Sequence, residues 1–240
     1  MAPPTRPAAS AWRAWAGPAA FVAAMAAYCV GRSVAIDGDL HPWTNTLVGL
    51  VVLAGATGAG FDRRELGVEG RDAGRGLAFG AATVVVAAIG MLLVAVLPAT
   101  RDVFADDRAV VSTGAMLRRT LVVIPLGTAL LEEVVFRGVL LAWLARRMSI
   151  WRAAWWSSVL FGLWHIPPTL HSADGTGAIG DAAHGGSGTA LVVVGVVVAM
   201  TGAGLALCWL RIRSRSLVAP FIAHWGINAT AFAVAWTVGR

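Results

Sequence analysis

The sequence predicts an all-α integral membrane protein, a polytopic helix bundle with about seven transmembrane helices. Of its 240 residues, 58% are hydrophobic and only 13% are charged, and the mean hydropathy is +0.72. An ordinary soluble domain carries about 25% charged residues. Runs of about 18 or more nearly uncharged residues, the length that can cross a bilayer, recur along the chain. The apolar runs are continuous rather than alternating, which favours helices over a transmembrane β-barrel.

Seven apolar segments follow a polar N-terminal segment, residues 1–16. The length of the first and the lack of a small-x-small cleavage site favour a membrane helix over a signal peptide. Pro98 ends the third segment and Pro167-Pro168 end the fifth, because proline interrupts a helix. The predicted transmembrane helices are Gly17–Val34, Leu47–Phe61, Leu77–Leu97, Leu121–Leu144, Ala153–Ile166, Thr189–Leu210 and Leu217–Val238.

The net charge of +6 is explained by membrane topology rather than by nucleic-acid binding. All 19 basic residues are arginines, and most lie in short loops between apolar runs. With the N-terminus in the cytoplasm, the cytoplasmic segments hold about twice as many arginines as the outer ones, and most tryptophans fall at the interfaces. Trp164 and Trp225 lie mid-span instead. We expect a multi-pass cell-membrane protein with its C-terminus outside. Its expected partners include membrane lipid and no nucleic acid.

Two adjacent carboxylates, Glu132 and Glu133, lie inside the fourth apolar segment. A charged side chain near the centre of a membrane helix costs at least ~2.5 kcal/mol, so both acids need partners. Arg137 lies four residues after Glu133 and can pair with it along one helix face. Glu132 is rotated by about 100° from Glu133 around the helix axis. It therefore needs a partner on another helix.

Polar residues that can meet Glu132 occur in two other predicted helices. His165 ends the run Phe161-Gly-Leu-Trp-His165 in the fifth helix, and His224 and Asn228 lie one turn apart in the seventh. At ~1.5 Å per residue, Glu132 and His165 each lie about 18 Å, and His224 about 10 Å, from the inner ends of their helices. Within the error on helix ends, the three helices can present these groups at a similar depth.

A carboxylate, two imidazoles and an amide in a low-dielectric site are suited to hydrolysing an amide. Glu132 can act as a general base towards water, and a histidine can hold that water or bind a metal that polarises it. A second histidine and Asn228 can donate hydrogen bonds to an oxyanion. The sequence lacks His-Glu-x-x-His and Gly-x-Ser-x-Gly. Two other interpretations stay open, a non-catalytic immunity or scaffold protein of the same fold and a proton-coupled transporter.

Three motifs in these segments resemble those of one protein family. Glu132-Glu133-Val-Val-Phe-Arg137 resembles its Glu-Glu-x-x-x-Arg motif, Phe161-Gly-Leu-Trp-His165 its Phe-x-x-x-His motif, and His224-Trp-Gly-Ile-Asn228 its His-x-x-x-Asn motif. The family is that of the CAAX prenyl endopeptidases and bacteriocin-processing proteins, also called Abi or CPBP intramembrane proteases. The motifs occur in the family's order, and the resemblance covers about Leu121–Trp236.

The resemblance implies a role for each of these residues. Glu132 would activate the attacking water together with His165, and Glu133 and Arg137 would support the site. The substrate would be a peptide, or a prenylated or membrane protein. It would be cut near the cytoplasmic membrane face.

The resemblance also assigns the remaining residues and leaves the cofactor open. His224 and Asn228 would stabilise the oxyanion. Family members have been described both as metalloproteases and as glutamate proteases without a firmly bound metal. The expected cofactor is therefore zinc or another divalent metal, held by Glu132, His165 and His224, or none. We divide the chain into a cytoplasmic N-terminal segment (1–16), three N-terminal transmembrane helices with their loops (17–120) and a CPBP/Abi-like catalytic transmembrane core (121–238).

Overall fold

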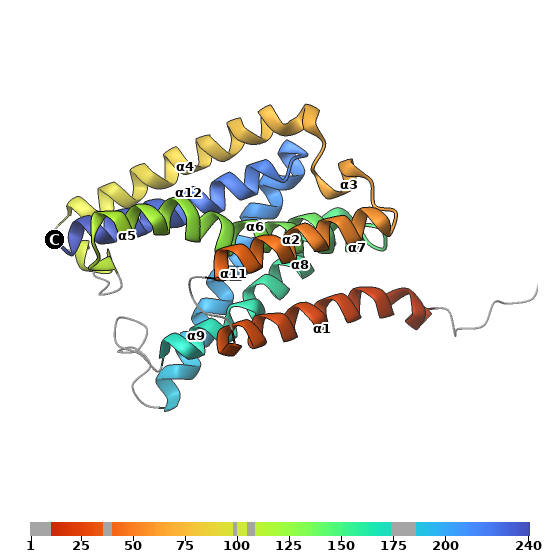
Figure 1. Cartoon of the computed structure of the whole chain (residues 1–240), viewed down its shortest axis with the longest axis horizontal. Coiled ribbons are helices and arrows are strands. Elements are labelled where there is room, and N and C mark those ends of the chain that lie inside the picture. The colour runs from red at the N-terminus through yellow and green to blue at the C-terminus, as the bar shows by residue number, and fades with distance from the viewer. Residues whose placement is uncertain (1–10, 36–39, 98–99, 105–108, 174–185) are drawn as a thin grey trace, which may run out of the picture.

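The structure is a computed structural model that describes residues 11–35, 40–97, 100–104, 109–173 and 186–240. All regular structure in these ranges is helical, and the long helices pack side by side as a bundle (Figure 1). The predicted all-α membrane helix bundle is confirmed.

The bundle consists of long helices joined by short ones. The long helices are α1 (Ala11–Ala35), α2 (His41–Gly58), α4 (Ala73–Val96), α8 (Ile150–Trp164), α11 (Gly186–Ser214) and α12 (Val218–Val238). The short ones between them are α3 (Arg63–Leu66), η2 (Gly70–Asp72), η3 (Arg101–Phe104) and α9 (Ile166–Ala173). One further helical rod, in six consecutive pieces, is α5 (Thr113–Arg118), η5 (Arg119–Val123), η6 (Pro125–Ala129), α6 (Leu130–Glu132), η7 (Glu133–Leu140) and α7 (Leu141–Ala145).

Each of the seven predicted segments contains a helix, but some ends differ. The second helix begins at His41 rather than Leu47, since Pro42 is tolerated in a first helical turn. Three described stretches, 63–96, 188–214 and 218–238, are long and apolar enough to cross a membrane. The count of seven spans, the orientation of the termini and the three-part division of the chain stay predictions.

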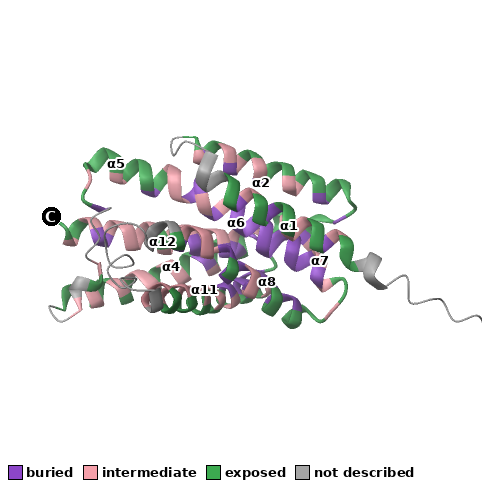
Figure 2. Cartoon of the chain, turned by 90° about the horizontal axis from the view of Figure 1, so that it is seen from below, coloured by how far each residue is buried: buried purple, intermediate pink, exposed green. Residues whose placement is uncertain are grey.

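The outer surface of this bundle differs from that of a soluble protein. Large apolar side chains on its outer faces are exposed, among them Val86 (71%) on α4 and Leu191 (72%) on α11. Polar side chains such as Asn45 and Ser157 are fully buried. The buried residues gather along α6, α7 and the neighbouring part of α8 (Figure 2). An apolar exterior is expected where the surrounding phase is hydrocarbon, and the interior combines a hydrophobic core with a smaller set of buried polar side chains.

Helices α4 and α12 approach closely because glycines face their partners. A Cβ added to Gly80 of α4 would lie 2.8 Å from the Ile222 Cβ and 2.9 Å from the Ala219 carbonyl oxygen on α12. Gly226 of α12 in turn receives Val84 of α4. Small residues at a membrane-helix interface allow such close backbone approach.

Polar contacts fix α1 and α2 onto the helical rod. Asn45 of α2 accepts a hydrogen bond from the Tyr28 hydroxyl of α1 at 2.5 Å. Its amide nitrogen donates to the carbonyl oxygen of Gly127. Near Pro125 the rod is π-helical, as is Glu133–Leu140, and such widened turns are frequent at functional sites. The rod is thus held where its acidic pair faces inward.

We predict that Gly80→Val lowers the free energy of unfolding by ~1–3 kcal/mol, because the added methyl groups must push α4 away from α12. Gly90→Val on the same helix is the control, since a Cβ there meets no atom within 4 Å. Thermal unfolding of the purified protein in detergent compares the two. Equal stability of both variants would contradict the close α4–α12 contact.

Candidate active site

The acidic pair, one tryptophan and one histidine come together from four elements of the bundle. Glu132 ends α6, Glu133 begins η7, Trp164 ends α8 and His224 lies in the second turn of α12. Glu132 is 3% exposed and His224 8% exposed, while Glu133 is fully buried. These polar groups are therefore removed from bulk water. In such a low-dielectric interior, electrostatic interactions are strong and unpaired polar groups are costly.

Glu133 joins η7 to α12 through one carboxylate oxygen. Its Oε1 accepts a hydrogen bond from Arg137 Nη1 at 3.0 Å and one from His224 Nδ1 at 2.7 Å. The Arg137 contact is the i, i+4 pair that the sequence spacing predicts, and both side chains are fully buried. Because a carboxylate accepts and does not donate, Nδ1 of His224 carries a proton. Glu133 thus fixes the orientation and the tautomer of the imidazole.

Glu132 has one fixed oxygen and one free oxygen. Its Oε1 accepts a hydrogen bond from the Trp164 indole at 3.0 Å. Its Oε2 lies 3.9 Å from His224 Nε2 and is buried without a hydrogen-bond partner among the residues that the structure describes. The expectation that Glu132 finds partners on other helices is confirmed, with α8 and α12 supplying them.

Three other buried polar atoms at this place also lack a hydrogen-bond partner in the described part of the chain. They are Glu133 Oε2 and the Nε and Nη2 atoms of Arg137. Buried polar groups in native proteins nearly always have a partner. The cluster has the capacity to bind a water molecule or the peptide group of a substrate.

The ring of Phe161 packs between the charged and the imidazole groups. The Arg137 Cζ lies 4.0 Å from its centroid, a cation–π contact. The His165 and His224 rings stand edge-on to it, at centroid distances of 4.7 Å and 6.1 Å. Phe161 therefore sets the spacing between the two histidines.

His165 caps the C-terminus of α8, where Pro167-Pro168 force a new helix to begin. Its Nδ1 lies 2.8 Å from the Phe161 carbonyl oxygen. Since a carbonyl only accepts, Nδ1 is the donor and Nε2 is the free nitrogen. Within the described residues no hydrogen bond or ion pair joins His165 to Glu132. The structure thus brings His224, but not His165, against the acid.

Asn228 lies one turn beyond His224 on α12 and is exposed. It lines a separate cavity of about 440 Å³, together with Arg119 and Ile124. The structure therefore does not bring the Asn228 amide into the polar cluster.

The predicted metal ligands Glu132, His165 and His224 are not arranged as a metal site. Among the residues that the structure describes, no three His, Cys, Asp or Glu side chains are placed to hold an ion. The Glu132 and His224 atoms that face each other are 3.9 Å apart. Two ligands of tetrahedral zinc, with bonds of ~2.0–2.1 Å, would lie closer together than that. The donor types suit zinc, but this arrangement does not bring the three side chains around one point.

Trp164 is the site residue that the motifs miss. It stands inside the second motif, at a position that the pattern leaves unspecified. One feature of the sequence could have pointed to it: Trp164 lies in the middle of a predicted transmembrane helix, away from the interfaces where membrane tryptophans are usual. Its indole binds Glu132, and Trp225, the other mid-span tryptophan, donates to the Thr120 carbonyl oxygen at 2.7 Å.

Comparison with known families supports one of the interpretations left open by the sequence. The sequence profile of the Rce1-like family, type II CAAX prenyl endopeptidases, matches residues 115–230. This match supports the family predicted from the three motifs. The matched region contains the whole polar cluster, and the match supports a CAAX-type intramembrane protease at the level of the family. Curated proteins and solved structures yield no match.

We predict that Trp164→Phe lowers the rate of hydrolysis about 10- to 100-fold, because a hydrogen bond to a charged group contributes ~1.5–3 kcal/mol. The aromatic ring stays in place, so the fold is retained. Trp225→Phe is the matched control, since it removes an indole hydrogen bond to a backbone carbonyl. Turnover of a fluorogenic peptide in detergent micelles gives the comparison. An equal effect of both substitutions would contradict a positioning role for Trp164.

Proposed function

We propose that this CAAX-type protease hydrolyses a peptide bond near the cytoplasmic membrane face by means of a water molecule activated by Glu132. The observation that carries the proposal is the asymmetry of this carboxylate. Trp164 holds Oε1, while Oε2 faces His224 Nε2 and has no hydrogen-bond partner within the described ranges. A base that is fixed on one side and free on the other can take a proton from a bound water without moving.

The attacking water belongs between Glu132 and His224. Glu132 Oε2 and His224 Nε2 are 3.9 Å apart, so one water with hydrogen bonds of ~2.8 Å reaches both. In the neutral tautomer held by Glu133, Nε2 accepts a hydrogen bond, as does the carboxylate. The water then donates both of its hydrogens, and its lone pairs point away from the two acceptors. The family resemblance gives this task to Glu132 with His165, but the distances favour His224.

The chemistry follows from this arrangement. The water oxygen bonds to the carbonyl carbon as Glu132 takes its proton, and the same proton passes to the leaving nitrogen when the carbon–nitrogen bond breaks. The oxyanion needs donors, and the resemblance gives this role to His224 and Asn228. In the tautomer held by Glu133, Nε2 of His224 accepts a hydrogen bond and does not donate one. Because Asn228 lies outside the cluster, it would have to approach with the bound substrate.

Glu133 and Arg137 act on this site through His224. A carboxylate that accepts a hydrogen bond from Nδ1 keeps the imidazole in one tautomer, with its Nε2 acceptor towards the water. Arg137 balances the charge of Glu133, which would otherwise be a lone anion in a dry interior. We therefore assign both residues a positioning role.

We further propose that residues 121–238 form the catalytic core, with the site open towards the cytoplasm and residues 1–16 on the same side. Support comes from the family match over 115–230 and from the origin of all cluster residues within it. The substrate class that fits the family is a peptide carried by a membrane or lipid-modified protein. A non-catalytic member of the family is the second candidate, favoured by the 3% exposure of Glu132.

We predict that Glu132→Gln reduces hydrolysis by about 10²–10⁴-fold, because it removes the general base and keeps the shape of the side chain. The Gln oxygen can still accept the Trp164 hydrogen bond, so the fold should be unchanged. Comparison of the host's membrane proteome between wild type and variant identifies the substrate as the protein that stays uncut.

The control is Glu65→Gln, in an exposed pair with Arg146 outside the site. The Glu65→Gln variant should cleave the substrate at the wild-type rate. A substrate that is processed equally by wild type and Glu132→Gln would eliminate the protease mechanism and favour the non-catalytic alternative.

A further inference from the structure

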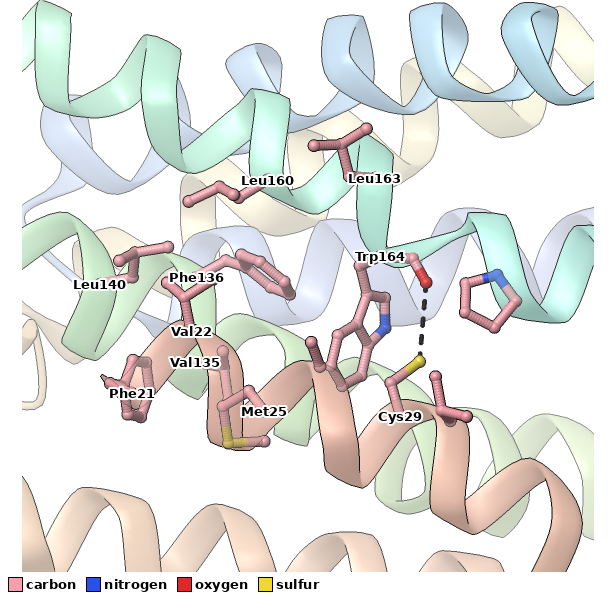
Figure 3. A pocket seen from close by; sticks show the side chains of 13 residues that line it. Phe21, Val22, Met25, Cys29, Val135, Phe136, Leu140, Leu160, Leu163 and Trp164 are labelled. Atoms are coloured by element: carbon pink, nitrogen blue, oxygen red, sulfur yellow. Dashed lines mark hydrogen bonds between the residues drawn. The ribbon is translucent and has the colours of Figure 1, made fainter. Parts of the chain in front are cut away.

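An apolar cavity lies directly behind the carboxylate site. It has a volume of about 260 Å³ and is lined by thirteen residues from α1, the η7 segment and α8 with the start of α9 (Figure 3). Trp164 forms part of its wall, and the other edge of the same indole carries the N–H that holds Glu132. The cavity and the candidate active site therefore share one side chain.

The lining offers no polar group to a ligand. None of the lining residues is charged, and only Cys29 and Trp164 have side-chain donors. Cys29 Sγ lies 3.6 Å from the Trp164 carbonyl oxygen, a contact drawn in Figure 3, and the indole N–H is used by Glu132. An extended peptide needs partners for its N–H and C=O groups. The cavity is therefore unsuited to a peptide backbone and suited to a hydrocarbon.

The cavity is elongated and opens towards the lipid-facing surface. Its α1 wall runs from Phe21 to Val30, about 13 Å along the helix axis at ~1.5 Å per residue. Val30 and Leu163 at its edge are 52% and 44% exposed, whereas Met25 and Val135 inside are 7% and 2% exposed. Its opening therefore joins the surface that membrane hydrocarbon covers.

We propose that this cavity binds one acyl chain of a membrane lipid. In a bilayer, acyl chains surround the opening, and a void left beside them would lose the dispersion contacts of its lining atoms. An inserted chain restores those contacts and needs no hydrogen bonds. It lies against Trp164, so that, given the proposed function, the bilayer itself helps to hold the indole on Glu132.

Photolabelling tests the proposal without reference to proteolysis. The full-length protein is reconstituted into phosphatidylglycerol vesicles that contain a phospholipid with a diazirine in its acyl chain, and the labelled residues are mapped by mass spectrometry. Met25 and Val135 are buried, so labelling there requires a chain inside the cavity. We expect label on both residues, in addition to the exposed Leu92 and Leu93 of α4, which touch bulk lipid.

A filled cavity provides the matched comparison. Ala26 lines the cavity, while Ala27 is exposed beside it on α1 and does not. Ala26→Trp should lower the labelling of Val135 about tenfold. This is the loss of binding expected when two methylene groups of the acyl chain can no longer be buried in the cavity. Ala27→Trp should leave it unchanged. Leu163→Trp fills the opening from α8 and repeats the test if the first variant does not fold.

Three outcomes would overturn the proposal. Label confined to exposed positions such as Leu92 would show ordinary contact with bulk lipid only. Equal labelling of Val135 in the filled variants would show that the chain lies elsewhere. Loss of the label on addition of a farnesylated peptide would assign the cavity to the substrate rather than to a membrane lipid. Because the readout is binding, these results differ from the loss of cutting that tests Glu132.

Discussion

The arrangement depends on the carboxylate of Glu133, which accepts hydrogen bonds from Arg137 on its own helix and from His224 on α12. A fully buried charge is tolerated only with well-placed partners, and removal of one partner of a buried pair typically costs ~3–5 kcal/mol. The exposed pair of Glu65 and Arg146 has similar distances, yet such surface pairs contribute only ~0–1 kcal/mol. The need to satisfy Glu133 in a hydrocarbon surrounding therefore brings α12 against the helical rod and fixes His224 opposite Glu132.

The packing of the remaining helices serves the same geometry. Gly80 lets α4 lie close behind α12, and Asn45 ties α2 to the rod beside the acidic pair. At the end of α8 the chain turns at His165, which leaves Trp164 facing Glu132 and the apolar cavity together. One oxygen of Glu132 is thereby held by the protein, and the other is the one to which we assign the proton transfer. The indole of Trp164 binds Glu132 and also lines the apolar cavity.

Much of this could be predicted from the sequence, because a membrane leaves few options for polar residues. The all-α bundle followed from long apolar runs, the Glu133–Arg137 pair from its spacing of four, and the family from three ordered motifs. Depth along a helix does not determine the direction in which a side chain points. For that reason the sequence predicted His165 and His224 equally well as partners of Glu132, whereas only His224 reaches it. Trp164 was missed because a tryptophan is usually a packing residue, and its hydrogen bond depends on the bend at the end of α8.

A double-mutant cycle between Glu133 and His224 tests most directly whether this contact holds the site together. The variants are Glu133→Met, His224→Phe and the two combined, which replace each polar side chain with an apolar one of similar volume. Unfolding is followed in detergent micelles. Because the hydrogen bond involves a charged group, we predict a coupling free energy of ~1.5–3 kcal/mol, so that the double variant is less destabilised than the sum of the two single variants. Effects that add within ~0.5 kcal/mol would contradict the contact and, with it, the fixed position of His224 beside Glu132.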